Sequence, residues 1–336
     1  MSRRIQIQTK SLNLDFTIDA ILAFVGGNVA SKREILNVLL QTATRYIEEH
    51  QEKLIINSGK IWFDGMEINN RNIDIIYLDQ YHSLYKEIIL KKTYLLYDEV
   101  IELSNQIQIV NQVEQINDEI SKFEFQMNQS LNSVYPELSL NFPYISQDIL
   151  MKKFATLELN LELVTSKKMI DTFLKLVSHH ISQTGNRMWI ILDGIDRHFD
   201  VEELTFLYES LEKIANDTHR LNIFLFNMDH TIERLNILPE NCILVYNDIQ
   251  QLSPINEMYL SIERHYPDNN LLAEELLQKR ILKILPYIGY SGELSLSGKD
   301  MVLLMILKKL LGDDSKIETS IESLSNLENL YLENQV

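Results

Sequence analysis

The sequence predicts an α/β fold: a head with a parallel-rich sheet and degenerate P-loop-like topology, interrupted by a long α-helical leg and followed by a C-terminal helical extension. Three observations predict it. Short β-rich runs alternate with helical segments before and after the middle of the chain. That middle has no Gly or Pro from about residue 84 to 134. A glycine pair and a lysine follow an early strand, in the layout of a phosphate-binding loop. We expect the head at 1–84 and 183–252, the leg at 85–182 and the extension at 253–336.

The first part of the head is expected to consist of strands and one helix. The β-rich runs are RRIQIQT, LNLDFTI, AILAFVGG and NIDIIYL, and the segment with helical periodicity is SKREILNVLLQTATRYIEEH. Between them, KLIINSGKIWFDGMEI is typical of a β-hairpin, with turns at Ser58-Gly59 and Asp64-Gly65.

The leg is expected to begin with one very long helix. Apolar residues recur there with spacings of three and four, at Val100, Leu103, Ile107, Val110, Val113, Ile116, Ile120, Phe123 and Met127. Pro136 and Pro143 end this pattern, and further helices are expected up to residue 183. Two interpretations stay open: an antiparallel helical hairpin with a coiled-coil seam, or a leg through which subunits associate.

The second part of the head returns to α/β alternation. Its expected strands are RMWIILDGID, RLNIFLFNMD and NCILVYND, and its expected helices are VEELTFLYESLEKIAND and the short HTIERLNI. Near-continuous apolar strands of this kind indicate a parallel sheet covered on both faces. From Ser253 onward the sequence is acidic and is expected to be helical.

The loop FVGGNVASKREIL departs from a functional P-loop at two positions. If Gly26, followed by Gly27, is the first glycine of G-x-x-x-x-G-K-[ST], Ser31 replaces the second glycine. Lys32 keeps the lysine, and Arg33 replaces the Mg²⁺-binding hydroxyl. Asp193 closes a strand in the manner of a Walker B aspartate, but Asp at a strand end is common. We therefore expect a degenerate P-loop without ATP turnover.

Other catalytic signatures are absent from the sequence, which has no G-x-S-x-G or H-E-x-x-H motif. The single cysteine, Cys242, excludes an intrachain disulfide and is expected in the core, and His179-His180 is expected to be structural. Two acidic groups can each gather a cation or form a solvated face: Asp193, Asp196 and Asp200 in the head, and Asp98, Glu99 and Glu102 in the leg. Oxygen ligands of this kind suit Ca²⁺.

The net charge of -17 argues against a protein coated in nucleic acid, yet an acidic exterior can coexist with a basic channel. Basic residues gather in the leg, at Lys86, Lys91, Lys92, Lys122, Lys152, Lys153, Lys167 and Lys168. If several subunits turn these faces inward, a positive lumen forms that holds duplex DNA by its phosphates without reading sequence. No run of about 18 apolar residues and no signal-peptide core are found. We expect a cytoplasmic protein without membrane contact.

The order of these segments resembles the Csn-two family of type II-A CRISPR systems. The likeness covers about residues 1 to 250: the degenerate P-loop, the KIWFDGMEI hairpin, the helical insertion, and WIILDGIDRHFDVEELTFLYESLEKIANDTHRLNIFLFNMD followed by NCILVYND. The C-terminal tail looks like that of the long-form subgroup.

The resemblance implies a role in antiviral defence, in the acquisition of new spacers, with two integrase-forming adaptation proteins and the effector nuclease as partners. It further implies a non-enzymatic homotetrameric ring with a lysine-lined hole that binds the ends of linear double-stranded DNA without sequence preference. In several members Ca²⁺ keeps the ring in shape, and no motif fixes its ligands here. Two alternatives remain from the residues alone: a P-loop nucleotide-binding ATPase using Lys32 and Asp193, and a coiled-coil scaffold that recruits proteins.

Overall fold

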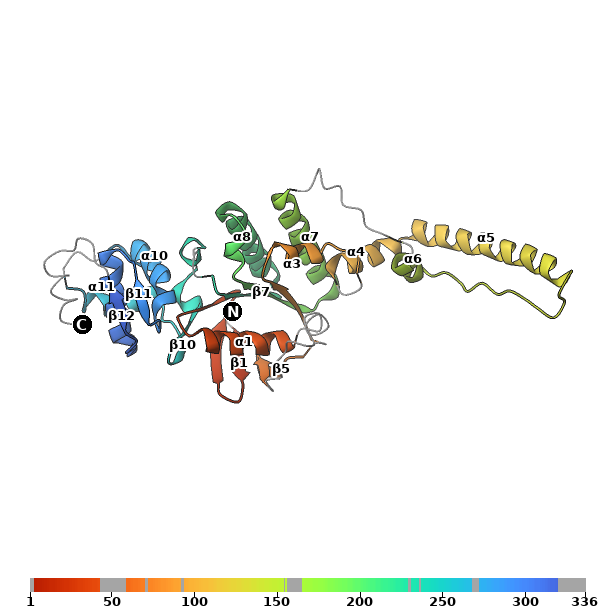
Figure 1. Ribbon diagram of the computed structural model, residues 1–336. Coiled ribbons are helices and arrows are strands. Elements are labelled where there is room, and N and C mark those ends of the chain that lie inside the picture. Colours follow the sequence, from red (N-terminus) through yellow and green to blue (C-terminus); the bar gives the residue numbers. More distant parts are fainter. Residues whose placement is uncertain are drawn as a thin grey trace. The chain divides into compact units, whose positions relative to one another are not determined.

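The computed structural model describes most of the chain, and its described residues are 3–42, 59–69, 72–91, 94–153, 155, 165–228, 231–235, 237–267 and 272–319. The chain divides into two compact units (Figure 1). One consists of residues 1–83 and 184–336, and the other of residues 84–183. The C-terminal residues thus fall in the same unit as the head.

A six-stranded sheet forms the centre of the head, in the order β10-β9-β3-β8-β7-β6. Its strands are β3 (Ile21–Val25), β6 (Ile73–Leu78), β7 (Arg187–Asp193), β8 (Leu221–Phe226), β9 (Cys242–Val245) and β10 (Ile249–Gln251). Every pair is parallel except β10 with β9. All residues of β3, β8 and β9 are buried, as their continuous apolar sequences require. The predicted α/β fold with a parallel-rich sheet is confirmed.

A second, antiparallel sheet has the order β2-β1-β4-β5. Its strands are β1 (Arg3–Gln8), β2 (Asn13–Ile18), β4 (Lys60–Phe63) and β5 (Met66–Glu67). Alternate residues of β2 are buried, so one face of this sheet meets the core. The hairpin turn at Asp64-Gly65 is confirmed, and both residues have positive φ, as a tight hairpin turn requires. The other expected turn includes Ser58, which lies outside the described residues.

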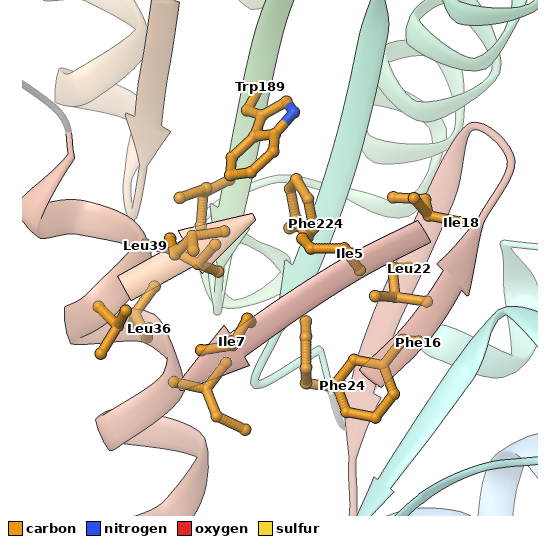
Figure 2. Packing of buried hydrophobic residues seen from close by; sticks show 14 of the residues in the cluster. Ile5, Ile7, Phe16, Ile18, Leu22, Phe24, Leu36, Leu39, Trp189 and Phe224 are labelled. Atoms are coloured by element: carbon orange, nitrogen blue, oxygen red, sulfur yellow. The ribbon is translucent and has the colours of Figure 1, made fainter. Parts of the chain in front are cut away.

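The main core lies between the two sheets and α1 (Val29–Gln41) (Figure 2). Phe24 of β3 stacks on Phe226 of β8 with ring centroids 4.4 Å apart. Trp189 of β7 meets Phe224 of β8 edge-on at 4.9 Å. The opposite face of the central sheet carries α8 (Val201–Thr218), as Figure 1 shows. Both faces of the central sheet are therefore covered, and this packing holds in place the strand ends at which the loops begin.

Short 3-10 turns lie in the loops of the head, and one of them stands where a short helix was expected. These are η1 (Ile195–Arg197), η2 (Ile232–Arg234) and η3 (Pro239–Asn241). The short helix predicted in HTIERLNI is only the single turn η2.

The C-terminal residues fold onto the head through α10, which packs against η2, α9 and α11. The elements are α9 (Ile255–Glu263), α10 (Glu274–Ile284), η4 (Leu285–Tyr287), β11 (Gly292–Leu294), α11 (Gly298–Leu311) and β12 (Ile317–Thr319). The predicted all-helical extension is therefore wrong in one respect, because β11 and β12 form a parallel pair.

Asp300 anchors α11 to α10 and makes the head sensitive to acid. Its buried carboxylate accepts from Arg280 Nη1 at 2.9 Å and from Lys283 Nζ at 2.8 Å. Burial alone would raise the pKa of Asp300, but Lys283, Ser297 and Arg280 outweigh it and hold the pKa below its usual value. An unfolded Asp has a pKa of about 3.9, so this stabilisation is complete above that pH and is lost as the pH falls through the folded-state pKa.

We therefore expect the melting temperature to fall as the pH is lowered below about 4, and to fall less steeply in Asp300→Asn. Thermal unfolding followed by circular dichroism at each pH measures both slopes. Equal slopes in the two proteins would contradict this role for Asp300.

The leg contains several helices where one long helix was predicted. They are α3 (Tyr81–Lys86), at the boundary with the head, α4 (Leu95–Ser104) and α5 (Ile107–Asn132). The further helices expected up to residue 183 are present as α6 (Gln147–Lys153) and α7 (Ser166–Thr184). The single helix from about residue 84 to 134 is wrong. Buried Glu87 accepts a hydrogen bond from the Leu95 N–H at 3.2 Å and so caps the start of α4. Gln106 is extended and separates α4 from α5.

The partner of α5 is an extended segment, residues 135–146, and not the antiparallel helix that a coiled-coil seam requires (Figure 1). Three side chains on one face of α5 hold it. Asn117 bonds the backbone N–H and C=O of Ile145 at 2.8 and 2.9 Å, and Asn128 does the same for Leu140 at 2.7 and 2.9 Å. Glu124 accepts from the Phe142 N–H at 2.9 Å. Side-chain hydrogen bonds therefore replace the predicted seam.

Asn117→Ala should release this segment, because it leaves the Ile145 backbone groups without their partner. We expect faster hydrogen exchange at Ile145, by about tenfold for each 1.4 kcal/mol lost. Asn111→Ala, an exposed site on the same helix, is the control. Unchanged exchange at Ile145 in Asn117→Ala would refute the contact.

Candidate functional site

The glycine loop joins β3 to α1 and packs against the end of β9. Gly26 has φ +107°, and a Cβ there would lie 2.3 Å from the Val245 carbonyl oxygen. The Asn28 N–H donates to that same oxygen at 3.2 Å. The Asn28 side chain accepts from the Ser31 N–H at 3.1 Å and so caps α1. Gly26 is therefore required for close backbone packing within the protein.

A backbone segment of the C-terminal residues occupies the space beside Gly27. The Gly27 N–H donates to the Ile288 carbonyl at 2.7 Å. A Cβ on Gly27 would lie 2.6 Å from the Tyr290 backbone nitrogen. A phosphate-binding loop needs backbone N–H groups that point at the ligand. Here the N–H groups of Gly27 and Asn28 are bonded to the protein's own carbonyls, and the 288–290 segment lies where a ligand would approach.

Asp313 holds the 288–290 segment in place. Its Oδ2 accepts from the Gly289 N–H at 2.8 Å and from Lys308 Nζ at 2.7 Å, and Ser315 completes the set. The Asp313 and Lys308 side chains are 0% and 7% exposed. Tyr246, the residue after β9, adds a hydrogen bond to the Leu311 carbonyl at 2.9 Å. The sequence pattern around Gly26 gave no sign of this partner, which lies more than 250 positions along the chain.

The remaining P-loop candidates have structural surroundings. Lys32 is only 2% exposed, within α1. Asp193 accepts from Tyr77 Oη at 2.8 Å and from Asn227 Nδ2 at 2.6 Å. Asp200 is the N-cap of α8, in a capping box with Glu203. Within the described ranges these acids do not form a ligand cluster with Asp196. The geometry thus gives no support to nucleotide chemistry at this loop.

The predicted DNA-contacting lysines differ in their surroundings. Lys122 pairs with Glu119 at 2.7 Å, which raises the pKa of Lys122, and Lys152 pairs with Asp148. Lys91 lies over the Tyr94 ring, 5.1 Å from its centroid. The others are exposed Lys153, Lys167 and Lys168 and half-buried Lys86. Lys92 lies outside the described residues.

Those lysines are spread over α3, the segment after it, α5, α6 and α7. Lys153 and Lys168 remain as the exposed pair that forms no ion pair with another described residue. They are therefore the strongest candidates for phosphate contacts.

An exposed apolar surface on the leg was not expected as such. Of the apolar positions assigned to a helical seam, Val113 is buried, but Ile116, Phe123 and Met127 are exposed. Ile107 and Phe125 are 78% and 65% exposed. Further members are Val134, after α5, and five residues of the extended segment 135–146, called the return segment: Tyr135, Leu138, Leu140, Phe142 and Tyr144. At about 3.6 residues per turn, Ile107 and Phe125 lie on one side of α5, and Ile116, Phe123 and Met127 lie on the opposite side. Large exposed apolar residues gathered in this way mark interaction sites. The spacing of three and four residues was the sequence signal for this apolar surface. The partner predicted for it, an antiparallel helix, was wrong.

Part of the predicted acidic group in the leg is brought together by the fold. Glu99 and Glu102 lie one turn apart on α4 and face His179 of α7. Their ligand atoms lie within 4.8 Å of one another. His180 faces Asp98 at 3.5 Å. Sequence reasoning placed the carboxylates but did not connect them with the histidine pair.

Comparisons with known proteins bear on the fold and the family of the chain. Among the described helices, none is long and apolar enough to cross a membrane. No curated protein matches the chain. The crystal structure of Stu0660 of Streptococcus thermophilus is similar, with a TM-score of 0.78 and 20% identity over 99% of this chain and 100% of that chain. At that identity the likeness supports the fold. The model of the family CRISPR-associated protein Csn2, subfamily St, matches residues 7–333, and the chain belongs to this family.

Proposed function

We propose that this chain is a non-catalytic accessory of CRISPR adaptation that assembles as a homotetrameric ring and holds the ends of linear double-stranded DNA. Family membership over residues 7–333 carries the proposal, since it establishes a CRISPR-associated role. The geometry adds two supports, a surface for assembly and exposed cations for phosphate. In this proposal the ring delivers DNA to the integrase-forming adaptation proteins and works beside the effector nuclease, and Ca²⁺ keeps the ring in shape.

The assembly surface is the apolar surface of α5 and its return segment. A monomer that leaves Ile107 and Phe125, on one side of α5, in water bears a solvation cost of roughly 25 cal/mol per Å² of apolar area. A second leg with the same surface removes that area from water on both copies. This is the self-complementary contact that symmetric assemblies use.

Sizing tests the assembly. The wild-type chain, at 39.3 kDa, is expected to sediment as a tetramer with Ca²⁺ present. Phe125→Asp is expected to reduce the assembly to smaller species, because it places a charge in the apolar contact. The control is Glu137→Asp, in the segment of residues 135–146. Phe206→Asp does not serve as a control, because Phe206 lies on α8 in the head. A monomeric wild type at micromolar concentration, with and without Ca²⁺, would reject the ring.

Binding of linear duplex tests the function. The affinity should fall steeply with salt, because lysine contacts to phosphate release counterions. No binding at low salt, with or without Ca²⁺, would reject the clamp. The exposed apolar surface also suits a scaffold that recruits proteins. A scaffold would keep its partners when Lys153 and Lys168 become Glu, whereas a clamp would lose DNA.

Nucleotide binding is the other alternative, and the occupied loop speaks against it. ATP titrated into the full chain is expected to give no binding heat. Binding that disappears in Lys32→Ala would restore the nucleotide hypothesis.

A further inference from the structure

We propose that Glu99, Glu102 and His179 bind a divalent transition-metal ion of the zinc type that joins α4 to α7. The site lies wholly within the unit of residues 84–183. It does not depend on the proposed DNA clamp. The three ligand atoms, one from each side chain, lie within 4.8 Å of one another.

The distances between the three ligand atoms suit the binding of one ion by all of them. His179 Nε2 lies 3.0 Å from Glu99 Oε2 and 2.8 Å from Glu102 Oε2. Zinc-type ions bind nitrogen and carboxylate oxygen at about 2.0–2.2 Å, so two ligands of a tetrahedral ion lie about 3.4 Å apart, a little farther than these pairs. Glu99 and Glu102 reach the ion from one face of α4, and His179 reaches it from α7. Small side-chain adjustments are enough to centre an ion among them.

Hydrogen bonding alone leaves this site incomplete. Glu99 Oε2 is buried and has no hydrogen-bond partner. An imidazole nitrogen carries at most one proton, and the Glu102 oxygen lies closer to it and takes it. The Glu99 oxygen is then a buried acceptor without a donor, which is costly. A cation bound to the His179 lone pair compensates both carboxylates at once.

The donor set distinguishes this ion from Ca²⁺. Calcium takes six to eight oxygen ligands, whereas imidazole nitrogen suits zinc and neighbouring first-row ions. Two carboxylates also balance the charge of one divalent ion when the histidine is neutral. The adjacent pair His180 and Asp98, 3.5 Å apart, lies beside the site and supplies a further carboxylate that favours a cation. The predicted structural calcium, whose ligands no motif fixes, is therefore a separate question.

Titration of the chelator-treated full chain tests the site, with Co²⁺ as spectroscopic probe and Zn²⁺ as competitor. We expect one Co²⁺ per chain, with visible absorption bands that Zn²⁺ abolishes and that Ca²⁺ in excess leaves unchanged. Glu99→Gln and His179→Asn should each weaken binding by more than about tenfold, since loss of even an outer contact at a metal site costs that much. Glu119→Gln and His265→Asn, at exposed positions that are not among the three ligands, should bind as wild type does.

Three results would overturn the proposal: no Co²⁺ or Zn²⁺ bound by the wild-type chain at micromolar concentration, undiminished binding in a folded His179→Asn, or displacement of Zn²⁺ by Ca²⁺. Circular dichroism establishes that the variants are folded. Because Glu99→Gln keeps the size of the side chain, it serves if His179→Asn does not fold. The wild-type titration decides the matter even if both variants fail.

Discussion

Replacing Lys308 by methionine is expected to lower the free energy of unfolding of the head by about 3 kcal/mol. The lysine stem is replaced by a side chain of similar length, so the main loss is the charge. Asp313 then remains buried without its cation, and only the Gly289 N–H and Ser315 still donate to it. Burial raises the pKa of Asp313, but Lys308 and these hydrogen bonds outweigh it and lower the pKa below its usual value. Without Lys308 the pKa of Asp313 should rise.

Denaturant unfolding measures this loss, and Lys309→Met, at the exposed neighbouring position, is the control. Lys308→Met should also loosen the 288–290 segment, so the Gly27 amide hydrogen should exchange faster in this variant. A loss below about 1 kcal/mol, the size typical of an exposed ion pair, would contradict the account of the occupied loop.

Replacing Lys153 and Lys168 together by glutamate is expected to weaken the binding of linear duplex by more than about tenfold, and to reduce its salt dependence. Both lysines are exposed, and neither pairs with an acid among the residues that the structure describes, so a phosphate gains their full charge. Reversal removes two cations from each subunit and adds two anions near the DNA. Filter binding or fluorescence anisotropy over a salt series measures both changes.

The matched control is the double variant Lys122→Glu and Lys152→Glu, which makes the same change of net charge. Glu119 and Asp148 already occupy these lysines, so their contribution to phosphate binding should be smaller. Equal losses in the two double variants would mean that net charge alone, and not these positions, determines binding.

The head could be predicted well because its signals are local. Continuous apolar strands such as that of Trp189 indicate a parallel sheet, and Asp64-Gly65 indicates a tight turn by its own conformational preference. The remaining features depend on partners far along the chain. That Gly27 donates to Ile288, and that His179 faces Glu99, follows only from the packing of separate helices and loops.

The leg shows why periodicity alone misled. Apolar residues at helical spacing indicated one long buried face, but the backbone is extended at Gln106. The side chain of Glu87 also accepts from the Leu95 N–H at the start of α4, a local hydrogen bond that competes with a continuous helix. Asn117 and Asn128 gave no sequence signal of their role, which is to hold the extended segment 135–146 by its backbone. Apolar residues of the leg that stay exposed, such as Phe125, form the candidate assembly surface.

The most direct test of the DNA-clamp proposal is a gel-shift titration of one plasmid in linear and in closed-circular form, with Ca²⁺ or with chelator. A closed ring can reach duplex only over an end. The account predicts that the linear form alone shifts, in regular steps, and that the shift weakens as salt is raised. Equal binding of the closed-circular form, or no binding of either form, would contradict it.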